Sequence, residues 1–168
     1  IVVTGTGGGT GTDCDKNYGV GVGTGSQISA SGTGAVTVIG TGGSAAEGND
    51  NVGVYVSDAN SKITAANGNV SVTGLGKGTG ANSKNNQGVY INTGGQITAG
   101  GASNTVTVQG TGGAAGGSFN YGVFVEKANS KISSSGGNVS VTGQGGGSGS
   151  SGNNMGVFVD SLGTITAG

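Results

Sequence analysis

The acidic residues come closest to a chemically useful pattern in this sequence of 168 residues. Asp13 and Asp15 stand on either side of Cys14 in a glycine-rich stretch, and such carboxylates, together with backbone carbonyl groups, could bind a calcium ion. The pair occurs once, and the sequence lacks the repeated Gly-Gly-x-Gly-x-Asp pattern of calcium-binding solenoids. A solvated acidic loop is therefore the favoured interpretation. Asp13 and Asp15 stay as the one metal candidate, and we expect no cofactor.

The residue types that enzymes use for acid–base and nucleophilic chemistry are scarce. The sequence has no histidine, which excludes histidine-dependent catalytic triads and imidazole metal ligands. It has no arginine either, and the acids fall at different positions of the repeat described below, so no convergent carboxylate pair is expected. Cys14, the single cysteine, can form no internal disulfide, and a passive thiol is favoured over an intermolecular bridge. We predict that the chain is not an enzyme.

The charge pattern excludes two classes of partner. Six lysines and seven acids give a net charge of −1, without the clustered basic residues that nucleic acids or anionic membranes attract. The sequence also contains no apolar run long enough to span a bilayer. We therefore expect neither nucleic-acid binding nor membrane insertion.

Three apolar elements recur along the chain at a nearly constant interval. The first, Asn-x-Gly-Val-x-(Val/Ile), begins at Asn17, Asn51, Asn86, Asn120 and Asn154, so that successive copies lie 34, 35, 34 and 34 residues apart. The second is an isoleucine followed by Ser or Thr, at Ile28, Ile63, Ile97, Ile132 and Ile165. The third, apolar-x-Val-x-Gly, begins at Ile1, Val36, Val70, Val106 and Val139, and a stretch of about ten residues rich in Gly, Ser, Ala and Asn follows it. A repeat of this length is typical of solenoids and related arrays.

The alternation of apolar and polar residues in these elements predicts strands, and 43 glycines argue against stable helix. One repeat alone buries almost nothing, but equivalent strands of successive repeats could pair in parallel. We predict an all-β parallel β-helix, or solenoid, of about five rungs of 34–35 residues, each with three short strands and a Gly-rich loop. We expect residues 1–168 to be a single solenoid segment, excerpted from a longer repeat array.

A second register has to be weighed against this one. The run 51–54 resembles the run 69–72, so each repeat could hold two small rungs instead of one large rung. The second half of the repeat would then lack an apolar residue matching the isoleucine, because Ala45, Gly80, Ala114 and Gly149 stand at those positions. One rung per repeat is therefore favoured.

Stacking of the repeats predicts rows of like side chains. The inward core rows are Val20, Val54, Val89, Val123 and Val157, then Ile28, Ile63, Ile97, Ile132 and Ile165. The asparagines at the motif starts (Asn17, Asn51, Asn86, Asn120 and Asn154) could form an Asn ladder with amide bonds between rungs, although a simple turn preference would also account for them. Strand parity places Tyr55, Tyr90, Phe124 and Phe158 outside, as a lateral interface or as a stripe that the Gly-rich loop covers.

The run from Ile63 to Gly74, Ile-Thr-Ala-Ala-Asn-Gly-Asn-Val-Ser-Val-Thr-Gly, resembles the repeats of large bacterial surface β-solenoids. These include filamentous-haemagglutinin-like adhesins, autotransporter passengers and giant β-strand-repeat proteins, and the resemblance covers essentially the whole chain. It implies a bacterial secreted or surface-anchored filament or stalk, and hence an extracellular or cell-surface location. The long Gly-rich loops and the lack of Leu-rich strands depart from that family, which leaves adhesin and fibre subunit both open.

Two functions are compatible with these patterns. The favoured one is a structural repeat segment of a long extracellular filament, stalk or adhesin, which coheres through stacked strands and side-chain ladders. Its partners would be further repeats of the same chain or other copies, joined end to end or laterally. The alternative is a solenoid module that presents a polar face or the aromatic stripe to a glycan or a cell surface. An ice surface ranks below these, because regular ice-binding faces want paired Thr-x-Thr and Ser replaces Thr here at Ser29, Ser71, Ser133 and Ser140.

Overall fold

The computed structural model describes residues 1–9, 11–12, 14–44 and 47–168, and the strands in it form three parallel sheets of five strands each. Sheet A contains β1 (Val2–Thr6), β4 (Val36–Thr41), β7 (Val70–Leu75), β10 (Val106–Thr111) and β13 (Val139–Gln144). Sheet B contains β2 (Val20–Val22), β5 (Val54–Ser57), β8 (Val89–Asn92), β11 (Val123–Glu126) and β14 (Val157–Asp160). Sheet C contains β3 (Gln27–Ala30), β6 (Lys62–Ala65), β9 (Gln96–Ala99), β12 (Lys131–Ser134) and β15 (Thr164–Ala167). The predicted all-β parallel solenoid is confirmed.

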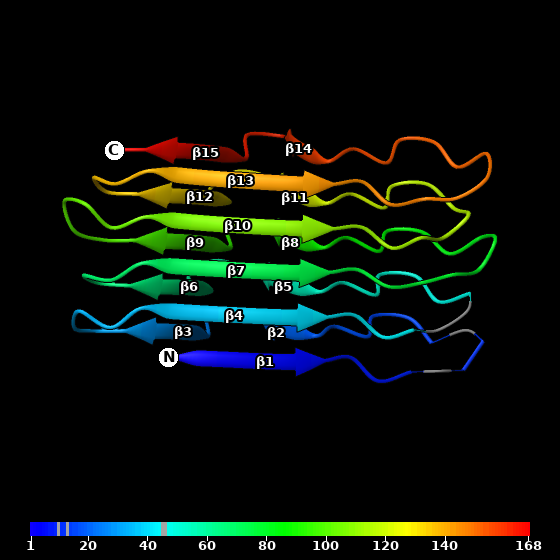
Figure 1. Ribbon diagram of the computed structural model, residues 1–168, viewed down its shortest axis with the longest axis horizontal. Helices are drawn as coiled ribbons and strands as arrows, with labels where there is room; N and C mark the ends of the chain where they lie inside the picture. The colour runs from blue at the N-terminus through cyan, green and yellow to red at the C-terminus, as the bar shows by residue number, and fades with distance from the viewer. Residues whose placement is uncertain (10, 13, 45–46) are drawn as a thin grey trace.

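Each strand pairs with the equivalent strand of the next repeat, so one repeat makes one rung. Val54 lies beside Val89 in sheet B, Ile63 beside Ile97 in sheet C, and Gly40 beside Gly74 in sheet A. The chain winds as a right-handed coil, with sheet A in front and sheets B and C behind it in Figure 1. This hand is the usual one for parallel strands, because a right-twisted strand returns to its sheet that way. The alternative of two small rungs per repeat is wrong.

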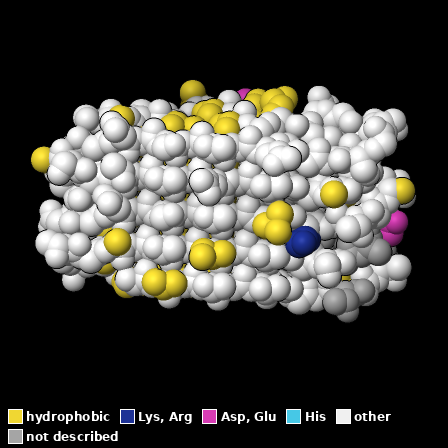
Figure 2. All heavy atoms as spheres, in the orientation of Figure 1, with side chains coloured by type: hydrophobic (Ala, Val, Ile, Leu, Met, Phe, Trp, Pro, Cys, Tyr) yellow, Lys and Arg dark blue, Asp and Glu magenta, His cyan; other side chains and the backbone are white. Residues whose placement is uncertain are grey.

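The apolar core runs along the axis of the coil, inside the three sheets. Its side chains come from alternate positions of every strand, as a period of two requires. The inward-facing valines and isoleucines of the three middle rungs are fully buried, for example Val89 and Ile97 at 0% exposure. The outward positions of sheet A carry mainly Thr, Ser and Gln, and Figure 2 shows a face that is largely polar, with scattered hydrophobic side chains.

Two rows of glycine close the base of each Gly-rich loop. A loop leaves sheet A just after one glycine and returns to sheet B just after another, for example between Gly110 and Gly122. A Cβ atom on Gly110 would overlap the carbonyl oxygen of Gly122, so the two backbones touch where only hydrogen side chains fit. The glycine of the Asn-x-Gly motif thus permits this close approach.

The Gly-rich loops stack on one another as regularly as the strands do. They lie together at one side of the solenoid (Figure 1), and the amide of Gly113 donates to the carbonyl oxygen of Asn86 at 2.8 Å, as that of Gly146 does to Asn120. Ser83 and Ala115 within the loops are fully buried. The loops therefore lie outside the apolar core of the sheets and have a small polar interior of their own, built around the asparagines.

Candidate functional site

The Asn ladder forms the interior of the stacked loops. Asn51, Asn86 and Asn120 are fully buried at 0% exposure. The side-chain amide of Asn86 donates to Oδ1 of Asn120 at 3.0 Å, and that of Asn17 donates to Oδ1 of Asn51 at 2.8 Å. Oδ1 of Asn86 in turn accepts the backbone N–H of Asn51 at 3.0 Å. Each amide therefore connects two rungs, and the neighbouring loop glycines leave room for it.

The residue before each ladder asparagine has a left-handed backbone. The five residues, with φ between 53° and 66°, are Lys16, Asp50, Asn85, Phe119 and Asn153. Asn and Asp tolerate this region because their short polar side chains bond locally, whereas a bulky aromatic residue there is an outlier. Phe119, with φ of 66° and 41% exposure, is thus the strained member of the row.

An aromatic column covers the outer face of sheet B. The rings of Tyr55, Tyr90, Phe124 and Phe158 follow one another with centroids 5.2–5.3 Å apart. In the first rung Gly21 occupies this row, and the ring of Tyr18 packs on Tyr55 with centroids 4.7 Å apart.

The aromatic column is only partly exposed. Tyr121 lies against both Phe124 and Phe158, with ring centroids 4.9 and 5.2 Å away, and Phe124 is only 8% exposed. Residues at the loop ends, just before the strands of sheet B, therefore cover part of the column. The lateral interface at Tyr55, Tyr90, Phe124 and Phe158 stays a prediction, with a smaller accessible surface than strand parity implied.

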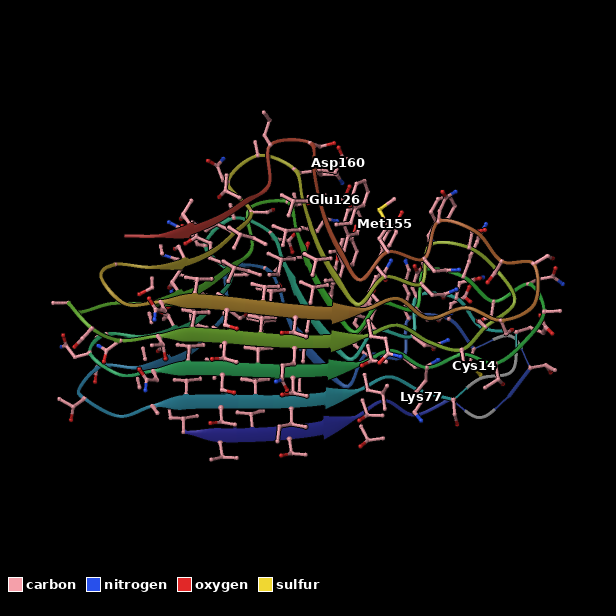
Figure 3. The ribbon with its side chains drawn as sticks, turned by 45° about the horizontal axis from the view of Figure 1, so that its top comes forward. Cys14, Lys77, Glu126, Met155 and Asp160 are labelled. Carbon is pink, nitrogen blue, oxygen red and sulfur yellow. The ribbon has the colours of Figure 1, made fainter. Side chains whose placement is uncertain are left out.

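A cleft of about 240 Å³ opens beside the column, over the middle rungs. We call it the aromatic cleft; its main lining residues are Asp50, Gln87, Tyr90, Phe119, Tyr121 and Glu126. The hydroxyl of Tyr90 donates to Oε1 of Glu126 and accepts a hydrogen bond from the side-chain amide of Asn92 at 2.9 Å. In Figure 3 Glu126 and Asp160 lie close together where the strands of sheet B end, whereas Lys77 and Cys14 lie away from them on the side of the loops.

Burial and negative charge dominate the electrostatics of the cleft. Burial raises the pKa of the Asp50 carboxyl above its ordinary value, and the hydrogen bond from Asn85 opposes that shift. Burial, followed by the hydrogen bond to Glu126, raises the pKa of the Tyr90 hydroxyl. Burial and the charges of Asp160 and Glu126 raise the pKa of Tyr121. The tyrosines therefore stay neutral, and the cleft presents carboxylates.

The acidic pair singled out in the sequence has a different environment. Asp13 lies outside the described residues. Oδ1 of Asp15 accepts the backbone N–H of Asn49 from the next rung at 2.6 Å, which gives this carboxylate a structural partner. Within the described part of the chain, no group of three or more His, Cys, Asp or Glu residues is placed to hold a metal ion. Cys14 is half-buried and its thiol is free.

The two ends of the solenoid expose side chains that the middle rungs bury. Val157 and Val159 continue the inward rows of Val123 and Val125, yet they are 38% and 40% exposed, against 0% for the two residues beneath. At the other end Ile1, next in line with Val36, is 53% exposed. Figure 2 shows hydrophobic side chains gathered along the upper edge, above the last rung. Both ends thus offer apolar rows and strand edges of matching pattern.

Sequence reasoning identified the rows but missed six of the eight residues that line the cleft. Gln87 and Tyr121 occupy the variable position of the Asn-x-Gly motif, and Phe119 and Glu126 lie immediately before and after one copy of the whole motif. The row after the ladder asparagine reads Tyr18, Val52, Gln87, Tyr121 and Met155, so Gln87 is its one polar member. Comparing rungs position by position for such departures is the signal that could have found the cleft.

Comparisons of the chain with protein-family models, with curated proteins and with solved structures find no match. Over the residues that the structure describes, no helix is long and apolar enough to cross a membrane.

Proposed function

We propose that this chain is a structural segment of a long extracellular or cell-surface filament, stalk or adhesin of a bacterium. In this role the hydrogen bonds of the three sheets and of the Asn ladder hold successive rungs together along the axis, and the chain needs no catalytic centre. The proposal draws on the resemblance to bacterial surface solenoids and on the repetition of the same rung geometry along the whole chain.

The observation that carries the proposal is the match between the two ends. An added rung would cover Val157 and Val159 and pair with the free edge of β13, and the rows exposed at Ile1 and Val3 have the same pattern. Covering a valine that is 40% exposed contributes about 1 kcal/mol, and several such side chains lie at each end. Further rungs of the same chain or a second copy would both satisfy these surfaces.

The test is self-association of the chain as a function of its concentration, followed by sedimentation velocity and electron microscopy. We expect end-to-end particles and filaments, with a spacing of about 4.8 Å along the axis. Val159→Lys should abolish them, because it places a charge on the end of the stack. Ile39→Lys is the matched control, since Ile39 is 41% exposed on the outer face of sheet A.

Two results would contradict end-to-end assembly of separate copies. A chain that stays monomeric at every concentration has ends that do not associate. Assembly that survives Val159→Lys but is lost in Ile39→Lys is lateral, through the outer face of sheet A.

The polar outer faces favour a second candidate, a module that binds a glycan or another surface. On sheet C the hydroxyls of Thr64 and Thr98 lie 2.8 Å apart, in a row with Ser29, Ser133 and Thr166. On sheet A the row of Thr37, Ser71, Thr107 and Ser140 is parallel to the axis. Saturable binding to polysaccharide that is lost in Tyr55→Ala and Tyr90→Ala would favour this candidate, and thermal hysteresis would test an ice surface.

A further inference from the structure

The aromatic cleft is the place where the repeat is broken by polar and charged side chains. In the row after the ladder asparagine, Gln87 replaces apolar or aromatic residues. In the last row of sheet B, Glu126 follows Ser57 and Asn92, which are uncharged. Among the residues with a left-handed backbone before each ladder asparagine, Asp50 and Phe119 occupy the rungs on either side of Asn85. Stacking alone requires none of these residues, because other rungs fold in the same way without them.

Gln87 supplies a buried acceptor without a partner. The residue is 3% exposed, and its amide nitrogen donates to the carbonyl oxygen of Phe119 at 3.4 Å. Its Oε1 atom has no hydrogen-bond partner among the residues that the structure describes. A buried acceptor left unpaired is destabilising. Gln87 lines the cleft, so rotation of its side-chain amide would bring Oε1 to a donor held there and remove this penalty.

The charged groups of the cleft are also acceptors. The carboxylates of Asp50 and Glu126 line it, and no lysine does. Two donors nearby are already committed: the hydroxyl proton of Tyr90 goes to Glu126, and Asn85 donates to Asp50. The hydroxyl of Tyr121, which also lines the cleft, can either donate or accept. Lys16 and Lys84 act on Asp50 without lining the cleft. An occupant should therefore be positively charged and rich in donors.

The walls of the cleft suit a cation that carries an apolar stem. The rings of Phe119 and Tyr121 meet at 63° with centroids 6.2 Å apart, and Phe119 leaves 41% of its surface exposed. Aromatic faces attract ammonium groups, and methylene groups pack against them. A volume of about 240 Å³ is small, so the cleft admits a small group such as the end of an alkyl amine.

We propose that the aromatic cleft binds a primary alkylammonium group on a short aliphatic stem. The three N–H donors of the ammonium match Oε1 of Gln87 and the carboxylates of Asp50 and Glu126, while the stem lies against Phe119 and Tyr121. The same group occurs at the end of a free diamine or polyamine and at the end of a lysine side chain. This site goes beyond the proposed structural role and does not depend on it.

The test is a titration of the chain at low ionic strength, by calorimetry or by NMR, with two amine probes. The probes are 1,5-diaminopentane and Nα-acetyl-lysine N-methylamide; 1,5-pentanediol and glucose serve as neutral controls of similar size. We expect saturable binding of an amine and none of the neutral compounds. Tighter binding of the diamine assigns the cleft to a free polyamine, and tighter binding of the lysine derivative assigns it to a lysine of a partner protein.

Substitutions distinguish specific binding of the amine in the cleft from non-specific attraction to negative charge. Glu126→Gln and Asp50→Asn should each weaken amine binding by about tenfold or more, because each removes a charged acceptor. Glu47→Gln is the matched control: its carboxylate accepts the backbone N–H of Asn82 away from the cleft, so binding should be unchanged. Asn is tolerated in the left-handed backbone at residue 50, so Asp50→Asn should fold even if Glu126→Gln does not.

Three results would overturn the proposal. One is that the folded chain binds neither amine at amine concentrations up to about 10 mM. A dissociation constant above that limit is weaker than the millimolar affinity of a simple ion pair. Another is equal loss of binding in Glu47→Gln and Glu126→Gln, which would indicate non-specific attraction to a negative surface. The third is binding of glucose or the diol as tightly as the amines, which would make the cleft a carbohydrate site.

Discussion

The burial of the Asn ladder determines how much stability we expect the chain to lose when a ladder asparagine is replaced. Asn86→Ala removes three side-chain hydrogen bonds, in which Nδ2 donates to Asn120 and Ser83 and Oδ1 accepts the backbone N–H of Asn51, each at 3.0 Å. Each such bond contributes about 1 kcal/mol, and a buried partner left unpaired adds about 1–3 kcal/mol. Asn51 and Asn86 are both 0% exposed, so water cannot replace the lost bonds. We expect the free energy of unfolding to fall by about 3–5 kcal/mol.

Asn154→Ala is the matched comparison in the last rung. Its side chain also takes part in three hydrogen bonds, accepting the backbone N–H of Asn120 at 2.9 Å and its amide at 3.3 Å, and donating to Ser151 at 3.0 Å. Asn154 is only half-buried, so water can take over these bonds and the loss should be about 1–2 kcal/mol. Urea unfolding followed by circular dichroism measures both. For a chain of this length the melting temperatures should fall by about 10 °C and about 4 °C.

A third variant separates a ladder of amide bonds from a turn preference. Asn86→Asp keeps the turn-forming character but points an oxygen at Oδ1 of Asn120, where the amide donated before. Burial then raises the folded-state pKa of the new carboxyl, so the variant should be destabilised at pH 7 and should recover stability as the pH falls and protonation restores a donor. Equal losses in Asn86→Ala and Asn154→Ala, or an Asn86→Asp variant as stable as the parent at pH 7, would refute the ladder argument.

Other substitutions should have effects that depend on position in the stack. Gly110→Ala should destabilise the fold by about 3 kcal/mol, because its Cβ overlaps a carbonyl oxygen, whereas Gly32→Ala, with nothing within 4 Å, should change stability by less than about 0.5 kcal/mol; thermal melting compares the two. Ile91→Ala, at 0% exposure, should cost about 2–5 kcal/mol in urea unfolding, and Val159→Ala, at 40%, less than about 1 kcal/mol. Burial raises the pKa of Tyr18 to about 12, above its ordinary value of 10.0, so its contribution to stability is complete below pH 10 and is lost as the pH rises through 12. Tyrosinate absorbance of folded and urea-unfolded chain should show that difference, and coincident titrations would contradict it.

The rows of the solenoid could be predicted because they depend on translation along the chain. Val54 and Val89 hold the same place in successive repeats, and parallel pairing in register puts such residues side by side whatever the details of the turns. The outward direction of Tyr55 could be predicted in the same way, since alternate side chains of a strand point to opposite faces.

The side chains that cover the outer face of sheet B could not be predicted in this way. Tyr121 precedes its strand, and its position over Phe124 depends on the path by which the loop returns to sheet B. Tyr18 replaces the missing ring at Gly21 for the same reason. Strand propensity and hydrophobic periodicity describe residues within one strand. The contacts of Tyr121 and Tyr18 instead join the end of a loop to the face of a sheet, and their geometry depends on backbone conformations that many sequences share.

Composition and period alone determined that this chain is a parallel β-solenoid with apolar rows inside. Only the tertiary structure decided that one repeat makes one rung, that the loops have an interior of buried asparagines, and that Asp50, Gln87 and Glu126 line one cleft. The physical reason is distance along the chain. The repeat pattern can be read within each copy of the repeat. The cleft instead combines residues of three successive rungs that depart from this pattern, and these residues meet only once the rungs are stacked.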